Sequence, residues 1–312
     1  MAEMALSPVG TTADKLRLIA LRRRALRGDL KELYERPETE ALSMLKDLGF
    51  SSRIIERFFK PFFAGVFFDP ELDISSRAFE FVFRAFALGD TALPARGMGT
   101  IPAQLATKLP PESIRLQTRV RQLLERKVVL ESGERLQARA LVIATDGREA
   151  AHLLGRDVAR ETHGTTCFYF AAERPPLPGP NLALNGEGHG RINSLLVPSN
   201  LSEYYAPAGQ HLVTVNLLGI RSAPDLVEPQ LRKELVRWFG SDAQRWKRLA
   251  VYRLPAALPD QAPPVPYPGE RKAMVSQGLW VCSELGGAPS IQWALHSGTR
   301  AGESVSAALL GA

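Results

Sequence analysis

The chain has little cysteine and no long apolar run, and both shortages exclude classes of protein. Only two of its 312 residues are cysteines, Cys167 and Cys282, and they lie far apart in apolar segments. A disulfide framework or a cysteine metal site needs more cysteines, so neither is expected, and a reducing cytoplasm fits best. No segment approaches the roughly eighteen apolar residues of a membrane span, and residues 1–10 lack the pattern of a secretory leader. We therefore expect a cytoplasmic protein that is soluble or, at most, touches a membrane surface.

Signatures of several kinds of catalysis are missing as well. The sequence has no Gly-x-Ser-x-Gly elbow, no phosphate loop and no paired-carboxylate signature, so it assigns no catalytic residue. Its five histidines do not have the spacing of metal ligands, and no metal is expected. They are His152, His163, His189, His211 and His296. The net charge of +6 comes from scattered arginines, not from a basic stripe with aromatic residues, which argues against a nucleic-acid partner.

Helical periodicity fills the first part of the chain. Residues 12–33 predict one amphipathic helix, in which Arg22, Arg23 and Arg24 form a solvated face or, less simply, contact phosphate or lipid. A later helix is expected to end before Pro61. Residues 58–68 contain six phenylalanines, which a packed helical core explains. They could instead line a passage for an apolar substrate or contact a membrane.

Strand patterns follow, mixed with helices. Residues 115–120, 128–131 and 136–144 predict strands, and the last of these ends in an apolar run that suits a buried strand of an α/β sheet. Further strands are expected at 166–171, 193–197 and 211–218, and a helix at 226–239. The proline-rich residues 255–268 predict no regular structure. A short strand at 279–282, a glycine turn and a helix that starts near Ser290 close the chain.

Two of these strands end where ligands commonly bind. The strand at 140–144 stops at Thr145, and ligands of open α/β sheets bind at the carboxyl ends of strands. The strand at 279–282 runs through a turn into a helix, whose start has unpaired N–H groups and a partial positive charge. An anionic or electron-rich ligand is therefore one expectation there, and an ordinary helix end is the other.

Five segments in the same order resemble the flavin amine oxidase superfamily. The longest are Phe-Phe-Lys-Pro-Phe-Phe-Ala-Gly-Val-Phe at 58–67 and Leu-Pro-Ala-Arg-Gly-Met-Gly-Thr-Ile-Pro-Ala-Gln-Leu-Ala at 93–106. The others are residues 49–51, 135–145 and 289–301. Within the superfamily they look most like the phytoene desaturase-like branch, and the likeness runs from about residue 11 to the end.

The resemblance implies a fold, a cofactor and contact residues. It implies a mixed α/β protein in which an incomplete Rossmann-type FAD-binding domain, at 91–155 and 271–312, interleaves with a substrate domain. The substrate domain would comprise a helical part at 11–90 and a sheet part at 156–270. FAD would be the cofactor, and an apolar small molecule would be oxidised by hydride transfer to the flavin. Val120 and Thr145 would lie near the adenosine, Glu284 near the ribitol, and Ile291, Gln292 and Trp293 near the flavin pyrimidine.

The chain also departs from the family pattern. No strand and Gly-x-Gly-x-x-Gly turn precede residue 13, so it resembles the carboxyl-terminal three-quarters of such enzymes. Ser283 and Glu284 replace a usual Gly-Asp pair, and Trp293 replaces a glycine, where its indole could crowd the isoalloxazine or stack beside it. These departures leave an alternative open. The chain would then be a truncated non-catalytic remnant or a subunit of a split flavoenzyme, with another chain supplying the missing part.

Overall fold

The computed structural model describes residues 9–124, 126–157, 161–220, 223–270, 272–282 and 289–311. The chain forms two compact units, each built from two separate segments. Unit 1 contains Met1–Thr107 and Thr162–Val265, and unit 2 contains Lys108–Glu161 and Pro266–Ala312. Helices and sheets occur together, which confirms the mixed α/β class. In the described part of the chain, no helix is both long enough and apolar enough to cross a membrane.

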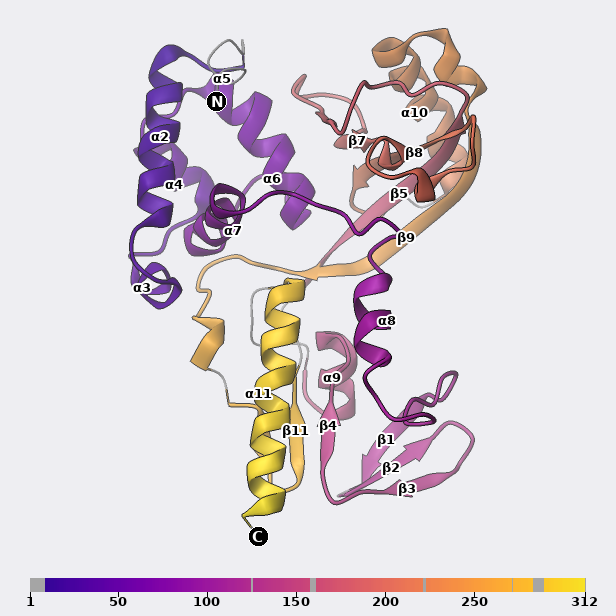
Figure 1. Cartoon of the computed structure of the whole chain (residues 1–312). Helices are drawn as coiled ribbons and strands as arrows, with labels where there is room; N and C mark the ends of the chain where they lie inside the picture. Colours follow the sequence, from indigo (N-terminus) through magenta and orange to yellow (C-terminus); the bar gives the residue numbers. More distant parts are fainter. Residues whose placement is uncertain are drawn as a thin grey trace. The chain divides into compact units, whose positions relative to one another are not determined.

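Helices make up the first half of unit 1 (Figure 1). They are α2 (Thr12–Leu26), α3 (Leu30–Glu35), α4 (Ala41–Asp47), α5 (Ser52–Ile54), α6 (Lys60–Phe67), α7 (Ser76–Leu88) and α8 (Thr100–Ala106). The prediction of one helix over 12–33 is wrong. Gly28 has a φ of +69°, and the side chain of Asp29 accepts a hydrogen bond from Glu32 N–H, so a second helix begins there.

The helix around Pro61 does not stop where the sequence predicts. A π-helical segment, Ile55–Phe59, joins α5 to α6, and Pro61 lies in the first turn of α6. Lys60 N–H bonds to the carbonyl of Ile55, five residues earlier, instead of to the usual i−4 carbonyl. A wider turn at this point accommodates a residue that has no N–H to donate, so the chain continues as a helix.

The phenylalanine-rich segment forms the core of the helical layer. Phe59, Phe63 and Phe79 are almost fully buried, and the ring centroids of Phe63 and Phe79 lie 4.2 Å apart. The core interpretation is therefore confirmed for these rings. Phe58 and Phe62 stack at the margin of the same cluster.

The arginine triplet of α2 is not simply a solvated face. Arg24 Nε donates to the carboxylate of Glu80 on α7, and Arg22 Nη2 lies 3.1 Å from the carbonyl oxygen of Ala87. The solvated interpretation is wrong for Arg24, because a buried glutamate on a neighbouring helix pairs with it. Sequence periodicity could not locate that glutamate.

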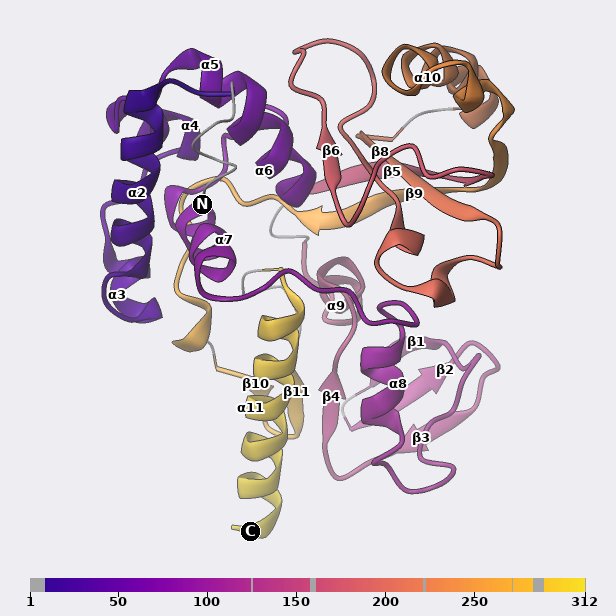
Figure 2. The same cartoon turned by 45° about the horizontal axis from the view of Figure 1, so that its top comes forward.

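A five-stranded antiparallel sheet completes unit 1, in the order β6-β7-β8-β5-β9. Its strands are β5 (Thr162–Ala172), β6 (Leu182–Leu184), β7 (Ser194–Leu196), β8 (His211–Leu218) and β9 (Lys247–Pro259). Helix α10 (Pro224–Phe239) lies against one face (Figure 2), where Phe168, Val215 and Leu231 share a buried cluster. The short 3₁₀ helices Pro198–Asn200, Glu203–Tyr205 and Ser241–Arg245 connect these elements.

Strand β9 corrects the prediction that residues 255–268 lack regular structure. It extends through Pro255 to Pro259. Because β9 is the edge strand of the sheet, N–H groups on its outer side need no partner, and proline is tolerated there.

Unit 2 contains two small sheets. Strands β1 (Val120–Leu124), β2 (Lys127–Leu130) and β3 (Arg135–Gln137) form an antiparallel sheet, and β10 (Met274–Ser276), β11 (Leu279–Val281) and β4 (Leu141–Ile143) form the other. Helices α9 (Gly147–Leu153) and α11 (Ile291–Leu310) and the 3₁₀ helix Pro268–Glu270 complete it.

Two strand predictions in unit 2 need correction. The first strand begins at Val120 and not at 115, because Gln117 has a φ of +53°, which breaks the extended chain. The predicted single strand over 136–144 is split between the two sheets. Ala138 N–H bonds to the carbonyl of Arg126, whereas Leu141 N–H bonds to that of Gly278, so the hydrogen-bond partners change between these residues.

Gly186 allows a close approach between the sheet and the helical layer of unit 1. A Cβ at this position would lie 2.9 Å from the carbonyl oxygen of Arg57, in the π-helical segment. We expect Gly186→Ala to lower the free energy of unfolding by about 1–3 kcal/mol, because backbone atoms must shift. Urea unfolding measures this. The control is Gly99→Ala, whose Cβ would meet nothing within 4 Å. Equal stability of the two variants would contradict the close approach.

Candidate functional site

The carboxyl ends of β4 and β11 meet at one edge of the sheet in unit 2. The two strands are parallel, with Leu279 opposite Leu141 and Val281 opposite Ile143. Cys282 N–H donates to the carbonyl of Ile143 at 2.9 Å, which extends the pairing by one residue. Because parallel strands end at the same edge, the chain leaves β4 and β11 side by side. The two segments singled out from the sequence therefore meet here.

Thr145 lies exposed just after β4. Its Oγ1 is 3.2 Å from the carbonyl oxygen of Asp146. The carboxylate of Asp146 caps α9, and its Oδ1 accepts hydrogen bonds from Arg148 N–H and Glu149 N–H, each at 3.0 Å. The charge of Asp146 is thus engaged by the helix start, and Thr145 is open to solvent at the edge.

The start of α11, ten residues after the end of β11, offers backbone donors. Ser290 caps the helix, and its Oγ accepts from Trp293 N–H at 3.3 Å. Ile291 and Gln292 are exposed, and within the described residues no hydrogen bond from either backbone N–H is recorded. With 20 residues, α11 has a full helix dipole, so these N–H groups suit an electron-rich oxygen. Glu284 lies outside the described residues, in 283–288.

The indole of Trp293 packs along the flank of α11. Its ring meets Tyr267 edge-to-face, with centroids 6.0 Å apart, and His296 in the same manner at 5.2 Å. Arg300 Nη1 donates to the carbonyl of Gly269 and holds the same loop against the helix. The indole of Trp293 therefore has aromatic contacts within unit 2.

Val120 belongs to the other sheet of unit 2. It is half-buried at the start of β1, opposite Leu130. Its neighbour Arg119 lies 3.7 Å from Glu149 of α9, measured from Nη2 to Oε2. This contact brings the start of β1 to the helix that follows Thr145. Val120 and Thr145 are thus linked through α9, whereas Ile291, Gln292 and Trp293 lie together in the first turn of α11.

Sequence reasoning missed the sheet face of unit 1 that is opposite α10. In β5, Phe168 and Phe170 point to the face covered by α10, so the alternate residues Cys167 and Tyr169 point to the opposite face. Tyr252 of β9 is opposite Cys167, and its ring meets that of Tyr169 edge-to-face at 5.3 Å. The strand pattern of residues 166–170 was the available signal, but it did not say which face α10 covers.

Two polar side chains on this face, Tyr169 and Cys167, are uncharged. Burial, and next the neighbouring Cys167, raise the pKa of Tyr169 to about 12. Burial also raises the pKa of the Cys167 thiol. Both groups therefore keep their protons at neutral pH. Such a face can contact apolar groups and donate hydrogen bonds, but it supplies no base.

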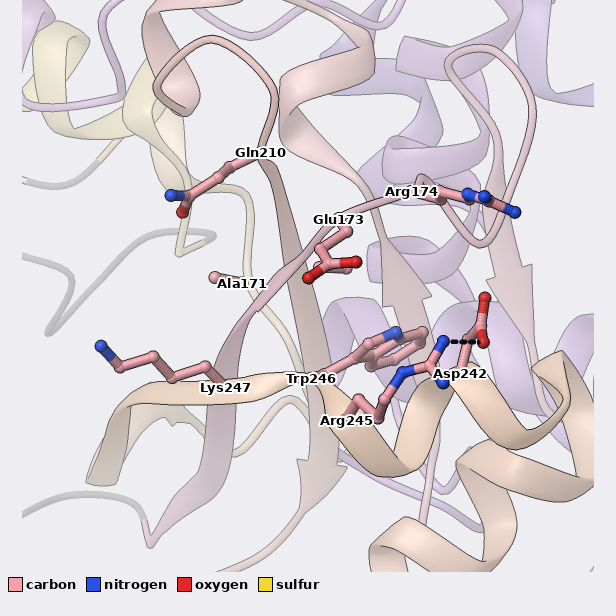
Figure 3. A pocket seen from close by; sticks show the side chains of 9 residues that line it. Ala171, Glu173, Arg174, Gln210, Asp242, Arg245, Trp246 and Lys247 are labelled. Atoms are coloured by element: carbon pink, nitrogen blue, oxygen red, sulfur yellow. Dashed lines mark hydrogen bonds and ion pairs between the residues drawn. The ribbon is translucent and has the colours of Figure 1, made fainter.

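A concavity in unit 1 lies at the end of β5 (Figure 3). It has a volume of about 320 Å³ and is lined by Glu173, Arg174, Trp246 and Lys247, among others. The guanidinium of Arg245 points at Asp242, 2.5 Å away, and Lys247 points away from the other labelled side chains. The labelled side chains that line this concavity do not point toward one common position, as the side chains of a catalytic site would.

Comparison with protein families finds a match over most of the chain. The sequence profile of the flavin containing amine oxidoreductases matches residues 7–305. Among curated proteins, none matches the chain.

Solved structures share the fold. An oxidoreductase from Methanosarcina mazei is 16% identical with a TM-score of 0.71, over 93% of this chain and 72% of that one. Putrescine oxidase bound to putrescine is 11% identical with a TM-score of 0.69, over 96% and 77% of the two chains. Cyclohexylamine oxidase from Brevibacterium oxydans is 15% identical with a TM-score of 0.63, over 97% and 76%. Identities this low show a common fold and no more.

Proposed function

Because this chain belongs to the family of flavin-containing amine oxidoreductases, we propose that it is an FAD-dependent oxidoreductase that oxidises an apolar substrate. The observation that carries the proposal is the parallel pair β4 and β11, each of which leads into a helix. Parallel strands followed by helix starts suit a nucleotide cofactor. The recorded contacts of Trp293, with Tyr267 and His296, lie on the helix flank and are compatible with a ligand at the helix start.

The residues of unit 2 would have distinct tasks. Bound FAD would supply the hydride acceptor. The N–H groups of Ile291 and Gln292 would donate to the pyrimidine oxygens, and the α11 dipole would favour negative charge there. Thr145 and Val120 would contact the adenosine half. Glu284, as a carboxylate, would accept from ribitol hydroxyls. No side chain is assigned as a general acid or base.

The sheet face of unit 1 opposite α10 supports an apolar substrate. Tyr169 and Tyr252 present aromatic surface, and Tyr252 is 55% exposed. Cys167 stays a thiol, so it places no charge against the substrate. The resemblance to the phytoene desaturase-like branch predicts the same substrate class. We propose that substrate lies against these three side chains.

Titration of the purified protein with FAD tests the cofactor assignment. We expect tight binding with a visible flavin spectrum, and Ile291→Pro is expected to weaken it about tenfold through loss of one N–H donor. Proline is favoured at the first helical position, and the extended backbone of Ser290 is compatible with a following proline, so α11 should persist. Gly298→Ala, in open space on the same helix, is the control.

Two outcomes would count against the assignment. If the wild-type protein binds no flavin, the enzyme proposal fails for this chain. If Ile291→Pro binds FAD as tightly as the control does, the flavin does not depend on the helix start.

A second candidate is a non-catalytic remnant or one part of a split flavoenzyme. Among the described residues β4 pairs only with β11, and Val142 is 44% exposed, although parallel strands are usually covered on both faces. A further strand and helix, supplied by another chain, would cover that edge. FAD binding that appears only when a polypeptide with a strand, a Gly-x-Gly-x-x-Gly turn and a helix is added would favour the split enzyme. Absence of binding under both conditions would favour the remnant.

A further inference from the structure

The outer face of α2 exposes large aliphatic side chains. The residues that α2 buries recur at helical spacing and therefore share one side of the helix. They are Asp14, Leu18, Leu21 and Ala25. Leu16 and Ile19 lie three residues apart on the opposite side, and they are 66% and 40% exposed. The side of α2 that points away from the helical core is therefore partly apolar.

The same face carries positive charge. Arg23 lies seven residues after Leu16, on the same side of the helix, and Arg27 follows at the C-cap. Both arginines are exposed, and in the part of the chain that the structure describes neither makes an ion pair. The one carboxylate of α2 is Asp14, which is completely buried and so cannot neutralise them.

The end of α7 adds apolar surface beside α2. Arg22 Nη2 donates to the carbonyl oxygen of Ala87 at 3.1 Å, which fixes the last turn of α7 against α2. The next residue, Leu88, is 67% exposed. An exposed aliphatic side chain of a second helix therefore adjoins the arginines of α2.

We propose that the outer face of α2 binds the surface of a bilayer that contains anionic phospholipids. The helix lies along the membrane plane, Leu16 and Ile19 enter the boundary between headgroups and acyl chains, and the guanidinium groups of Arg23 and Arg27 contact lipid phosphates. The contact is peripheral, since among the described residues no helix can cross a membrane.

The mixed chemistry of this face favours lipid over other anionic partners. A nucleic acid would pair with the arginines, but it would leave the aliphatic side chains against charged phosphates and water. An anionic bilayer offers phosphates and apolar groups at neighbouring depths, so it matches both kinds of side chain. With two aliphatic side chains and two cations at its centre, the contact is weak and reversible.

Co-sedimentation of the purified chain with lipid vesicles tests the proposal. One set of vesicles contains phosphatidylcholine alone, and in the other phosphatidylglycerol makes up about one third of the lipid. We expect about tenfold tighter binding to the anionic vesicles at about 0.1 M salt, and little binding to either set at about 0.5 M salt, where screening is stronger. The result is expected to be the same with and without FAD, so this proposal and the enzyme proposal can fail separately.

A double variant of the arginines measures the electrostatic part. Arg23→Gln with Arg27→Gln should weaken binding to the anionic vesicles about twentyfold, because each arginine near such a surface contributes about a factor of five. The control is Arg121→Gln with Arg135→Gln, at two exposed arginines of β1 and β3. It removes the same net charge, and we expect its binding to stay within about twofold of the wild type.

A double variant of the aliphatic side chains measures the apolar part. Leu16→Gln with Ile19→Gln should weaken binding about tenfold, because the side chains no longer favour the acyl boundary. The control is Leu116→Gln with Leu226→Gln, at leucines that are 81% and 78% exposed. Urea unfolding of each variant separates a loss of binding from a loss of fold.

Three outcomes would overturn the proposal. One is equal binding to the two sets of vesicles, or an equal loss of binding in the arginine variant and its control. Another is a dimer in lipid-free solution that Leu16→Gln with Ile19→Gln dissociates, since a second copy would then cover this face. The third is binding to duplex DNA, abolished by the arginine variant, without binding to anionic vesicles.

Discussion

Replacing Glu80 with glutamine is expected to lower the free energy of unfolding by about 3 kcal/mol. Glu80 on α7 is 1% exposed. Its carboxylate accepts from Arg24 Nε at the end of α2, and from Arg36 Nη1, just after α3, at 2.6 Å. One buried charge therefore ties three helices together. A neutral amide would leave both arginines without their carboxylate and would set its own N–H groups against theirs.

Urea unfolding at neutral pH measures the effect of Glu80→Gln. Asp225→Asn is the control, because it removes a carboxylate that is 82% exposed and lies 2.6 Å from Arg248. Surface pairs contribute little, so the control is expected within about 0.5 kcal/mol of the wild type. If both variants lose equally little stability, Glu80 does not hold the helices together.

Asp14→Asn is expected to lower the free energy of unfolding by roughly 2–3 kcal/mol at neutral pH. Asp14 is completely buried, and its carboxylate accepts four hydrogen bonds. Thr11 N–H and Thr11 Oγ1 donate to Oδ2 at 2.8 and 2.7 Å, Ser51 Oγ donates to Oδ2 at 2.6 Å, and Ser51 N–H donates to Oδ1 at 2.8 Å. An asparagine amide would place N–H groups against donors. The start of α2 would then lose its link to the cap of α5.

The loss caused by Asp14→Asn should depend on pH in a defined direction. Burial alone would raise the pKa of Asp14, but the hydrogen bonds from Ser51 and Thr11 hold it well below its usual range. A carboxyl whose folded pKa is depressed stabilises the fold fully above its unfolded pKa, near 4, and loses that contribution as pH falls. The difference between wild type and variant should thus be constant from about pH 5 to 7 and shrink below about pH 4.

The control for Asp14 is Asp29→Asn. Asp29 caps α3 by accepting from Glu32 N–H at 2.8 Å, in an exposed position, and asparagine caps helices almost equally well. We expect Asp29→Asn to lower the free energy of unfolding by only a few tenths of a kcal/mol. A pH-independent difference between Asp14→Asn and the wild type would show that the charge of Asp14 has no special role.

The sequence predicted elements whose signal is local. The strand at 211–218 and the start of α11 near Ser290 agree with the structure, because alternation and capping are read within a few residues. The break expected before Pro61 failed, since a π-helical turn just upstream accommodates the proline. Strand β9 was missed because its prolines are tolerated only at a sheet edge, and edge position is not local information.

The candidate site was predicted unevenly for the same reason. Strand ends and a helix start singled out Thr145, Ile291 and Gln292, and the structure pairs the two strands, β4 and β11, that precede these residues. The face with Tyr169 and Tyr252 was missed, because strand alternation defines two faces without saying which one a helix covers. The contacts of Trp293 with Tyr267 likewise depend on a loop that no pattern predicts.

The sequence by itself determined the mixed α/β class, the phenylalanine core and the family, because periodicity, composition and ordered motifs are properties of short segments. Only the tertiary structure decided which charges are buried and which segments are neighbours. The pairing of Glu80 with Arg24 and Arg36 and the parallel pairing of β4 with β11 each join residues that are distant in the chain. Such contacts form because packing buries apolar surface and requires each buried polar group to find a partner, and that requirement is met only by the whole fold.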